Sequence, residues 1–185
     1  VQVLVRALAP VLSFTAEEIW QHIPGSEPTS VFLAGNADLD ALLPAQGVYL
    51  DADDALMQQL LAMREAVSKV LEPMRAEGRI GAALQAEVTV YADGIDVAAM
   101  PGLQDELRFL FITSSLAVQP ENSAGSDAIA VEGTPFKVLA NVSKHGKCVR
   151  CWHYVESVGQ DAHDPELCGR CIVNVNGAGE VRRYF

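Results

Sequence analysis

Cysteine is absent from most of this 185-residue chain, and its four cysteines all lie between residues 148 and 171. Long apolar runs are missing too, since no stretch approaches the ~20 consecutive apolar residues that a membrane-spanning helix needs. No secretory signal and no glycine-rich phosphate-binding loop occurs. These absences argue against a membrane protein, a secreted disulfide-rich domain and a nucleotide-binding domain. We therefore expect a cytoplasmic protein.

Apolar material for a folded core is present. Half of the residues are hydrophobic, which is not typical of a disordered chain. The length fits one domain or two smaller ones. The chain begins at Val1, without methionine and inside a predicted helix, so we expect a piece of a longer protein.

Positive charge is scarce, and the net charge is −11. The shortage is uneven, because residues 1–134 hold 6 Lys and Arg against 19 Asp and Glu, whereas residues 135–185 hold 7 against 5. A locally basic face can bind phosphates even on an acidic protein. The overall charge therefore neither predicts nor excludes a nucleic-acid partner.

The hydrophobic pattern predicts an α+β protein in three parts. We expect residues 1–80 to be helical, residues 82–143 to form a small α+β module, and residues 144–185 to form a four-cysteine finger. The middle module is expected to pack between its two neighbours.

Two further helices are predicted in the first part, after the one at Val1. Thr15 and Glu18 have the spacing of a capping box at the start of one helix. The other helix has an apolar stripe at steps of four and three residues, made by Leu56, Leu60, Met63, Val67, Val70 and Met74. Glu65 and Lys69 can pair on its outer side. Between the helices, residues 24–53 are rich in Pro, Gly, Ser and Asp and are expected to form a loop.

The second part changes to a period of two. Residues 84–92 alternate apolar and polar side chains, which is typical of a strand. Residues 103–111 place apolar side chains on one helical face, and residues 114–119 are a possible second strand. Residues 128–133 and 136–143 are expected to pair as a hairpin.

The cysteine spacing C-x2-C-x16-C-x2-C predicts a structural zinc site. The proposed ligands are Cys148, Cys151, Cys168 and Cys171. Each C-x-x-C aims two thiolates at one point, and two such turns complete a tetrahedron. Disulfides and a rubredoxin-like iron site are alternatives, whereas a thioredoxin-like redox site would need one pair in a βαβ context. Because four thiolates leave no position for water, His145, His153 and His163 are expected to be surface or packing residues.

Cations alternate with aromatic rings near the cysteines, which suits a nucleic-acid surface. The candidate RNA contacts are Arg150, Trp152, Arg170, Arg182, Arg183 and Tyr184. Arg150 and Arg170 each precede a cysteine and are expected to point rigidly outward, whereas Arg182 and Arg183 follow glycines and are expected to be looser. The alternative for Trp152 is a cap on a very small core.

Several segments resemble class I aminoacyl-tRNA synthetases. The segment LAPVLSFTAEEIW is similar to a helix pair in the anticodon-binding domain of the enzymes for isoleucine, valine and leucine, and MREAVSKVLEPMRAEGRIGAALQAEVTVYA and LQDELRFLFITS continue the resemblance. The segments KCVRCWHY, LCGRCIVNV and GEVRRYF are similar to the carboxy-terminal zinc module of bacterial-type isoleucyl-tRNA synthetase. Valyl enzymes usually end in a coiled coil instead.

The resemblance implies a fragment without catalytic residues. Motifs like HIGH and KMSKS are absent, so ATP and Mg²⁺ would belong to a catalytic domain outside this chain, as would the domain that edits mischarged valine. The implied partners are isoleucine-accepting tRNA, held on its anticodon side, and the rest of the parent synthetase. No membrane partner is implied.

Two other functions stay open at this point. DNA glycosylases of the formamidopyrimidine type end in a four-cysteine finger of similar spacing that grips DNA. Their amino-terminal Pro-Glu and their helix–two-turns–helix are not visible in this sequence. The third possibility is a zinc ribbon that binds only protein.

Overall fold

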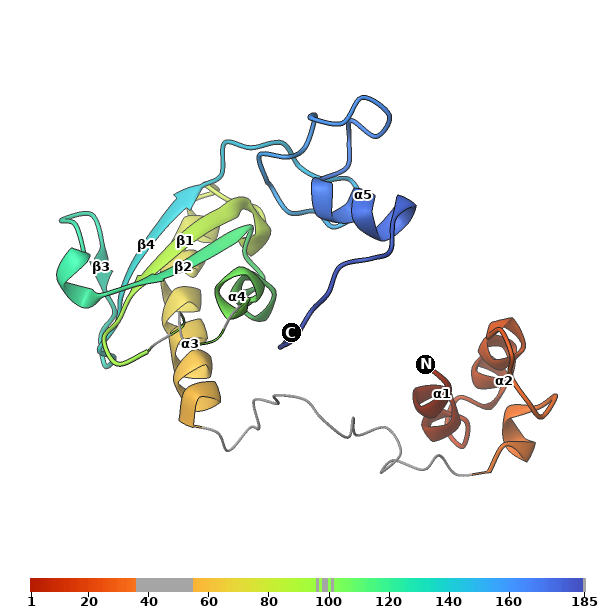
Figure 1. The fold of residues 1–185 in the computed structure, drawn as a ribbon. Helices are drawn as coiled ribbons and strands as arrows, with labels where there is room; N and C mark the ends of the chain where they lie inside the picture. Colours follow the sequence, from red (N-terminus) through yellow and green to blue (C-terminus); the bar gives the residue numbers. More distant parts are fainter. Residues whose placement is uncertain (36–54, 96, 98–99, 101, 185) are drawn as a thin grey trace. The chain divides into compact units, whose positions relative to one another are not determined.

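The computed structural model describes residues 1–35, 55–95, 97, 100 and 102–184 (Figure 1). The chain divides into two compact units, Val1–Gly47 and Val48–Phe185. Helices and a four-stranded sheet occur together, so the predicted α+β class is confirmed. Among the helices that are described, none is long and apolar enough to cross a membrane.

The first unit is a helical cluster around one buried tryptophan. Its elements are α1 (Gln2–Leu8), α2 (Ser13–His22) and the 3-10 turn η1 (Val31–Leu33). Trp20 is fully buried, and its indole N–H donates to the carbonyl of Pro28 at 2.8 Å. The carboxylate of Glu17 accepts hydrogen bonds from the Ser30 hydroxyl at 2.9 Å and from the Val31 N–H at 3.0 Å. These bonds attach the turn around η1 to α2.

The start of α2 differs from the prediction. The carbonyl of Leu12 accepts the first helical hydrogen bond, from the N–H of Ala16 at 2.8 Å, so Thr15 lies inside the helix. No side chain caps α2, and the predicted capping box is wrong. The predicted loop of residues 24–53 contains η1, and its residues 36–53 lie outside the described residues.

The second unit is built on a four-stranded sheet of order β2-β1-β4-β3. The strands are β1 (Ala86–Tyr91), β2 (Ser115–Gln119), β3 (Ile129–Ala130) and β4 (Lys137–Val142). Strands β1 and β2 are parallel and are joined through α4 (Leu103–Phe111). Strands β3 and β4 form the predicted antiparallel hairpin, and β4 also pairs with β1. The short 3-10 turns η3 (Ala83–Gln85) and η5 (Glu121–Ser123) lie beside the strands.

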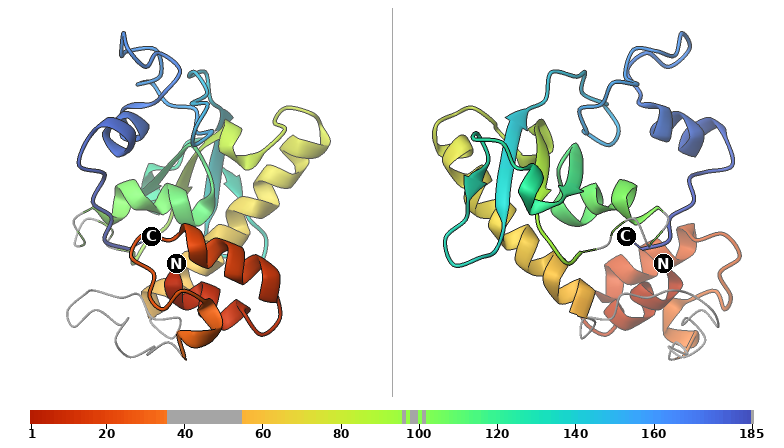
Figure 2. Two further views of the ribbon diagram at one scale, coloured as in Figure 1. Left: turned by 90° about the vertical axis from the view of Figure 1, so that its right-hand side faces the viewer. Right: turned by 60° about the vertical axis from the view of Figure 1, so that its left-hand side comes forward.

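Helix α3 (Ala55–Ala76) packs with α4 against the sheet (Figures 1 and 2). Its predicted apolar stripe is confirmed, because every member contributes to the main core, with Leu56 partly buried. The facing side chains of β1 are Ala86, Val88 and Val90, which alternate along the strand as predicted. Glu65 and Lys69 pair on the outer side at 3.2 Å. Gly78, with φ of +71°, follows the helix end in a left-handed conformation that suits glycine.

The three-part division predicted from the sequence separates α3 from its partners. The structure places α1, α2 and η1 in the first unit, whereas α3 shares its core with the sheet in the second. The periodicity of α3 shows which side is buried but not which element covers it.

The cysteine-containing segment, residues 144–185, continues from β4 and contains α5 (Gly169–Asn176). Lys147 and Tyr154 form an isolated antiparallel bridge at its start. After α5 the chain runs back to α4, which Arg183 and Tyr184 contact (Figure 1). The finger is therefore attached to the α+β module at both of its ends.

Candidate metal centre and nucleic-acid interface

The four thiols converge as their spacing predicts. One ligand sulfur from each of Cys148, Cys151, Cys168 and Cys171 lies within 4.8 Å of all the others. The sulfurs of Cys151 and Cys168 are 3.6 Å apart. In a tetrahedral zinc centre with Zn–S bonds of about 2.3 Å the sulfurs are about 3.8 Å apart, whereas a disulfide requires about 2.0 Å. All four cysteines are free, so the geometry fits zinc and does not fit disulfides.

Two different turns present the sulfurs. In the first turn, the N–H of Trp152 donates to the carbonyl of Cys148 at 2.9 Å. In the second, Cys168 is the N-cap of α5 and its carbonyl accepts from the N–H of Ile172 at 3.0 Å. The side chains around the sulfurs that add apolar contact are Val155, Val158 and Leu167, all only partly buried. This core is small, so the fold of the finger depends on the sulfur cluster.

Without metal, the thiols differ in their affinity for protons. Burial raises the pKa of the Cys148 thiol, but hydrogen bonds from the backbone N–H groups of Cys151, Cys168 and Arg150 lower it to about 6. Burial, helped by the neighbouring thiols, raises the pKa of Cys168 to about 12. Four clustered thiols resist ionising together until a cation neutralises them, which is the donor chemistry of a thiolate metal site.

The arginine in each C-x-x-C turn reaches toward the opposite turn. Nη1 of Arg150 lies 3.6 Å from Sγ of Cys171. Arg170 and Cys151, from opposite turns, line the same small cavity. Arg170 also pairs with Glu180 at 2.8 Å, and its side chain is only 18% exposed. The expectation that Arg170 points outward is therefore wrong, because the Glu180 carboxylate holds the guanidinium against the protein.

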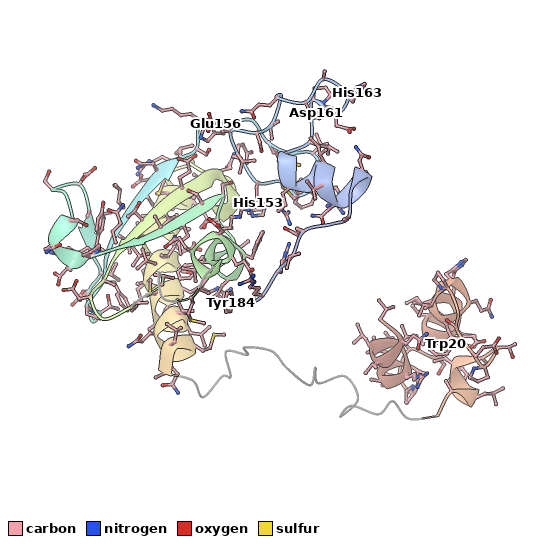
Figure 3. The ribbon with its side chains drawn as sticks, in the orientation of Figure 1. Trp20, His153, Glu156, Asp161, His163 and Tyr184 are labelled. Atoms are coloured by element: carbon pink, nitrogen blue, oxygen red, sulfur yellow. The ribbon has the colours of Figure 1, made fainter. Side chains whose placement is uncertain are left out.

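The carboxy-terminal tail is anchored along α4. The backbone N–H groups of Arg183 and Tyr184 each donate to the buried carboxylate of Glu106 at 2.8 Å. The side chain of Tyr184 packs against the main core, next to α4 in Figure 3. The guanidinium of Arg182 lies 4.0 Å from the ring centre of Phe109. Glu106 and Phe109 thus hold a segment that the sequence predicts to be looser than the cysteine turns.

Sequence reasoning missed Phe109, which lies where α4 meets the finger. The guanidinium groups of Arg108, Arg170 and Arg182 lie 5.0, 5.0 and 4.0 Å from its ring centre. The His153 ring meets it edge-on at 5.7 Å. In the sequence, Phe109 lies off the apolar stripe of its helix, and nothing local indicates which cations approach it.

The histidines pack or face solvent, as predicted, and none joins the thiol cluster among the described residues. His153 lies at the junction of the finger and α4 (Figure 3), with Nδ1 3.1 Å from the carbonyl oxygen of Cys151. Burial lowers the pKa of His153, and nearby arginines lower it further against the opposing effect of that carbonyl. His145 lies 3.6 Å from Glu87, and His163 is exposed in the outer loop.

Trp152 is an exposed ring beside a cavity. It is 59% exposed and has a left-handed φ of +66°, which is uncommon for a residue other than glycine. The ammonium of Lys147 lies 5.5 Å from its ring centre. A cavity of about 210 Å³ adjoins the ring and is lined by Gly81, Ala82, Leu84, Gln85, Lys147 and Tyr154.

Tyr154, by contrast, is held at both ends. Its backbone N–H donates to the Ser114 hydroxyl at 2.6 Å, and its own hydroxyl accepts from the side-chain amide of Gln85 at 3.2 Å. Trp152 therefore does not cap a small core, whereas Tyr154 joins the finger to the α+β module.

Two family descriptions match the chain. Residues 1–90 match "Anticodon-binding domain of tRNA ligase", and residues 146–173 match "Zinc finger found in FPG and IleRS". The isoleucine–tRNA ligase of Xanthomonas campestris pv. campestris (strain B100) is 48% identical over 184 residues, or 100% of this chain. The isoleucine–tRNA ligases of Pseudomonas paraeruginosa (strain DSM 24068 / PA7) and Stenotrophomonas maltophilia (strain K279a) are 46% and 48% identical over 99% and 97% of this chain.

The chain resembles the carboxy-terminal part of bacterial isoleucine–tRNA ligase along its whole length. The resemblance stated from the sequence segments is thereby confirmed. The chain spans 18% or 19% of the length of these relatives. The residues between the two family descriptions also lie inside the full-length match, so the similarity to the ligases includes the α+β module.

Proposed function

We propose that this chain is the tRNA-binding carboxy-terminal part of an isoleucine–tRNA ligase, which attaches isoleucine to its tRNA using ATP. The observation that supports this most strongly is 46% to 48% identity to such ligases along essentially the whole chain. The finger description alone covers two classes of protein, whereas the full-length match is to ligases. ATP, Mg²⁺, catalysis and editing belong to the rest of the parent enzyme, which acts in the cytoplasm.

The proposed cofactor is one structural zinc ion. Its ligands are Cys148, Cys151, Cys168 and Cys171. Four sulfur ligands leave no position for a reactive water, so the ion stabilises the finger and does not react. Because the apolar side chains near the sulfurs are only partly buried, metal binding supplies a large share of the finger's folding free energy.

The proposed RNA surface centres on Trp152 and Lys147. An exposed indole can stack on an unpaired base, which contributes ~1–3 kcal/mol, and an adjacent ammonium can contact a phosphate. Arg183 is a further exposed cation on the tail. The other candidates are Arg150, Arg170, Arg182 and Tyr184, whose side chains make contacts within the protein. We place the first contacts with RNA at Trp152 and Lys147.

A competition experiment tests this function. The 185-residue chain is titrated against labelled isoleucine tRNA, a valine tRNA of similar length and a DNA duplex of equal charge, at several salt concentrations. We expect isoleucine tRNA to bind most tightly. Tighter binding to duplex DNA would favour the glycosylase-like alternative, and binding to none of the three would favour a protein-binding ribbon.

A further inference from the structure

The proposed zinc centre carries a net negative charge that its surroundings must compensate. One zinc ion with four thiolates carries two more negative than positive charges, and three of the four cysteines are buried. Buried charge is costly unless it is paired and hydrogen-bonded. The backbone contributes part of the compensation, since the N–H of Cys168 lies 3.4 Å from Sγ of Cys148. Backbone N–H groups add no net charge, so cations are needed nearby.

The sequence supplies one arginine in each turn, at the same place. The turns are Cys-Val-Arg-Cys and Cys-Gly-Arg-Cys, and in both the arginine stands directly before the last cysteine. In the structure the two arginines cross over. Arg150, from the first turn, approaches the sulfur of Cys171 in the second, and Arg170, from the second turn, lines a small cavity together with Cys151 of the first.

We propose that Arg150 and Arg170 form a reciprocal pair of positioning residues for the metal site, each compensating the charge of the last cysteine in the opposite turn. The two guanidinium groups offset part of the excess negative charge, and their positions connect the turns across the metal. They also lower the reactivity of the thiolates, because a sulfur that accepts hydrogen bonds is a weaker nucleophile. This inference rests on the proposed zinc, and it assigns two candidate RNA contacts to the metal centre.

Further contacts fix the direction of Arg170. The Glu180 carboxylate accepts from it at 2.8 Å and from Arg182 at 2.9 Å. The backbone N–H of Glu180 donates to the side-chain oxygen of Asn174 at 2.8 Å. The ring of Phe109 lies 5.0 Å from the Arg170 guanidinium. Arg150 is more exposed and lacks this support, so we expect the pair to be unequal.

Zinc release tests the proposal in the 185-residue chain. The test variants are Arg150→Gln and Arg170→Gln. The control is Arg183→Gln, which also removes one positive charge. Each zinc-loaded protein is mixed with excess colorimetric chelator, and the rate of zinc transfer is followed together with alkylation of the thiols by iodoacetamide. Loss of an outer-shell partner weakens metal binding by roughly 10- to 100-fold, so we expect faster release and faster alkylation for the first two variants, with Arg170→Gln the larger effect. Arg183→Gln should match the unaltered chain.

Two further variants separate the thiolate contact from other roles of Arg170. Glu180→Gln removes its carboxylate partner but keeps the arginine and should change release less than Arg170→Gln. Arg150→Lys should recover part of the loss, because the charge returns without the guanidinium geometry. Release and alkylation rates of Arg150→Gln and Arg170→Gln equal to those of Arg183→Gln would overturn the inference. A chain that binds no zinc in any variant would instead overturn the proposed cofactor.

Discussion

At the scale of single residues, the sequence predicted the sulfur ligands but not the directions of the charged side chains. A C-x-x-C turn is a local structure, so its spacing alone indicates that Cys148 and Cys151 face one point. The direction of Arg170 depends on Glu180 and on Phe109, the second of which is remote in sequence. Phe109 was missed for the same reason, because the cations around it come from separate segments.

The exposed indole gives a prediction at this scale. Trp152→Ala should weaken binding of isoleucine tRNA at every salt concentration, by the ~1–3 kcal/mol of a lost stacking contact. The salt slope should stay unchanged, because no charge is removed. Lys147→Gln should instead lower the salt slope by roughly one unit, as expected for one lost phosphate contact.

Fluorescence titrations over a range of salt concentrations measure both quantities. Zinc content and circular dichroism of Trp152→Ala are measured first. We expect both to be unchanged, because the ring is 59% exposed. A variant that loses zinc would show that the ring is structural, and unaltered tRNA binding would remove Trp152 from the RNA surface.

At the scale of elements, periodicity predicted what is buried but not what covers it. The stripe on α3 and the alternation in β1 were both predicted, because each follows from the geometry of one element. The pairing of α3 with the sheet was not, since it depends on elements distant in sequence. The start of α2 was misplaced because the turn after α1 already supplies the first helical bond through Leu12.

A pH dependence is expected in the first unit. Burial raises the pKa of Glu17, but hydrogen bonds from Ser30, Val31 and Gln21 lower it, and the net pKa lies below its ordinary value. A depressed carboxyl pKa stabilises the fold above the unfolded value of about 4.3, and this stabilisation is lost as pH falls through the folded value. The contact between α2 and η1 should therefore loosen in acid.

Emission from Trp20 measures this loosening. In a Trp152→Phe background Trp20 is the only tryptophan, and we expect its emission to shift to longer wavelength as the pH falls below about 4. Glu17→Gln in the same background should lose most of this step. An identical acid transition with and without Glu17→Gln would assign the change to another group.

Metal removal should unfold the finger and leave the α+β module folded. Cys148→Ser, or chelation of the unaltered chain, should open the finger to trypsin while α3, α4 and the sheet stay folded, because their core is separate from the sulfur cluster. Mass spectrometry should show early cleavage after Arg170 and late cleavage after Arg64. His163→Ala, in the outer loop, is the matched control and should retain about one zinc per chain with all thiols reduced. Equal protease resistance with and without metal would contradict a structural zinc.

At the scale of the whole molecule, the similarity to isoleucine–tRNA ligases was predicted from segments spread along the chain. The four cysteines alone do not distinguish two classes of protein, because the family description that they match names both FPG and IleRS. The helical and α+β segments distinguish the two, because the match to ligases extends over them. The contacts of the finger with α4 and η3, through Glu106 and Gln85, could not be predicted, since no local pattern specifies them.

The most direct test of the account uses the full-length parent ligase with and without Cys148→Ser. Two activities are compared in the same preparations: isoleucine-dependent pyrophosphate exchange, which needs only the catalytic domain, and charging of isoleucine tRNA. The account predicts that exchange survives while charging falls, because the role proposed for the finger is to hold tRNA and not to take part in the chemistry. The 185-residue chain alone should show no exchange. Equal loss of both activities, or charging that persists after zinc is lost, would contradict the account.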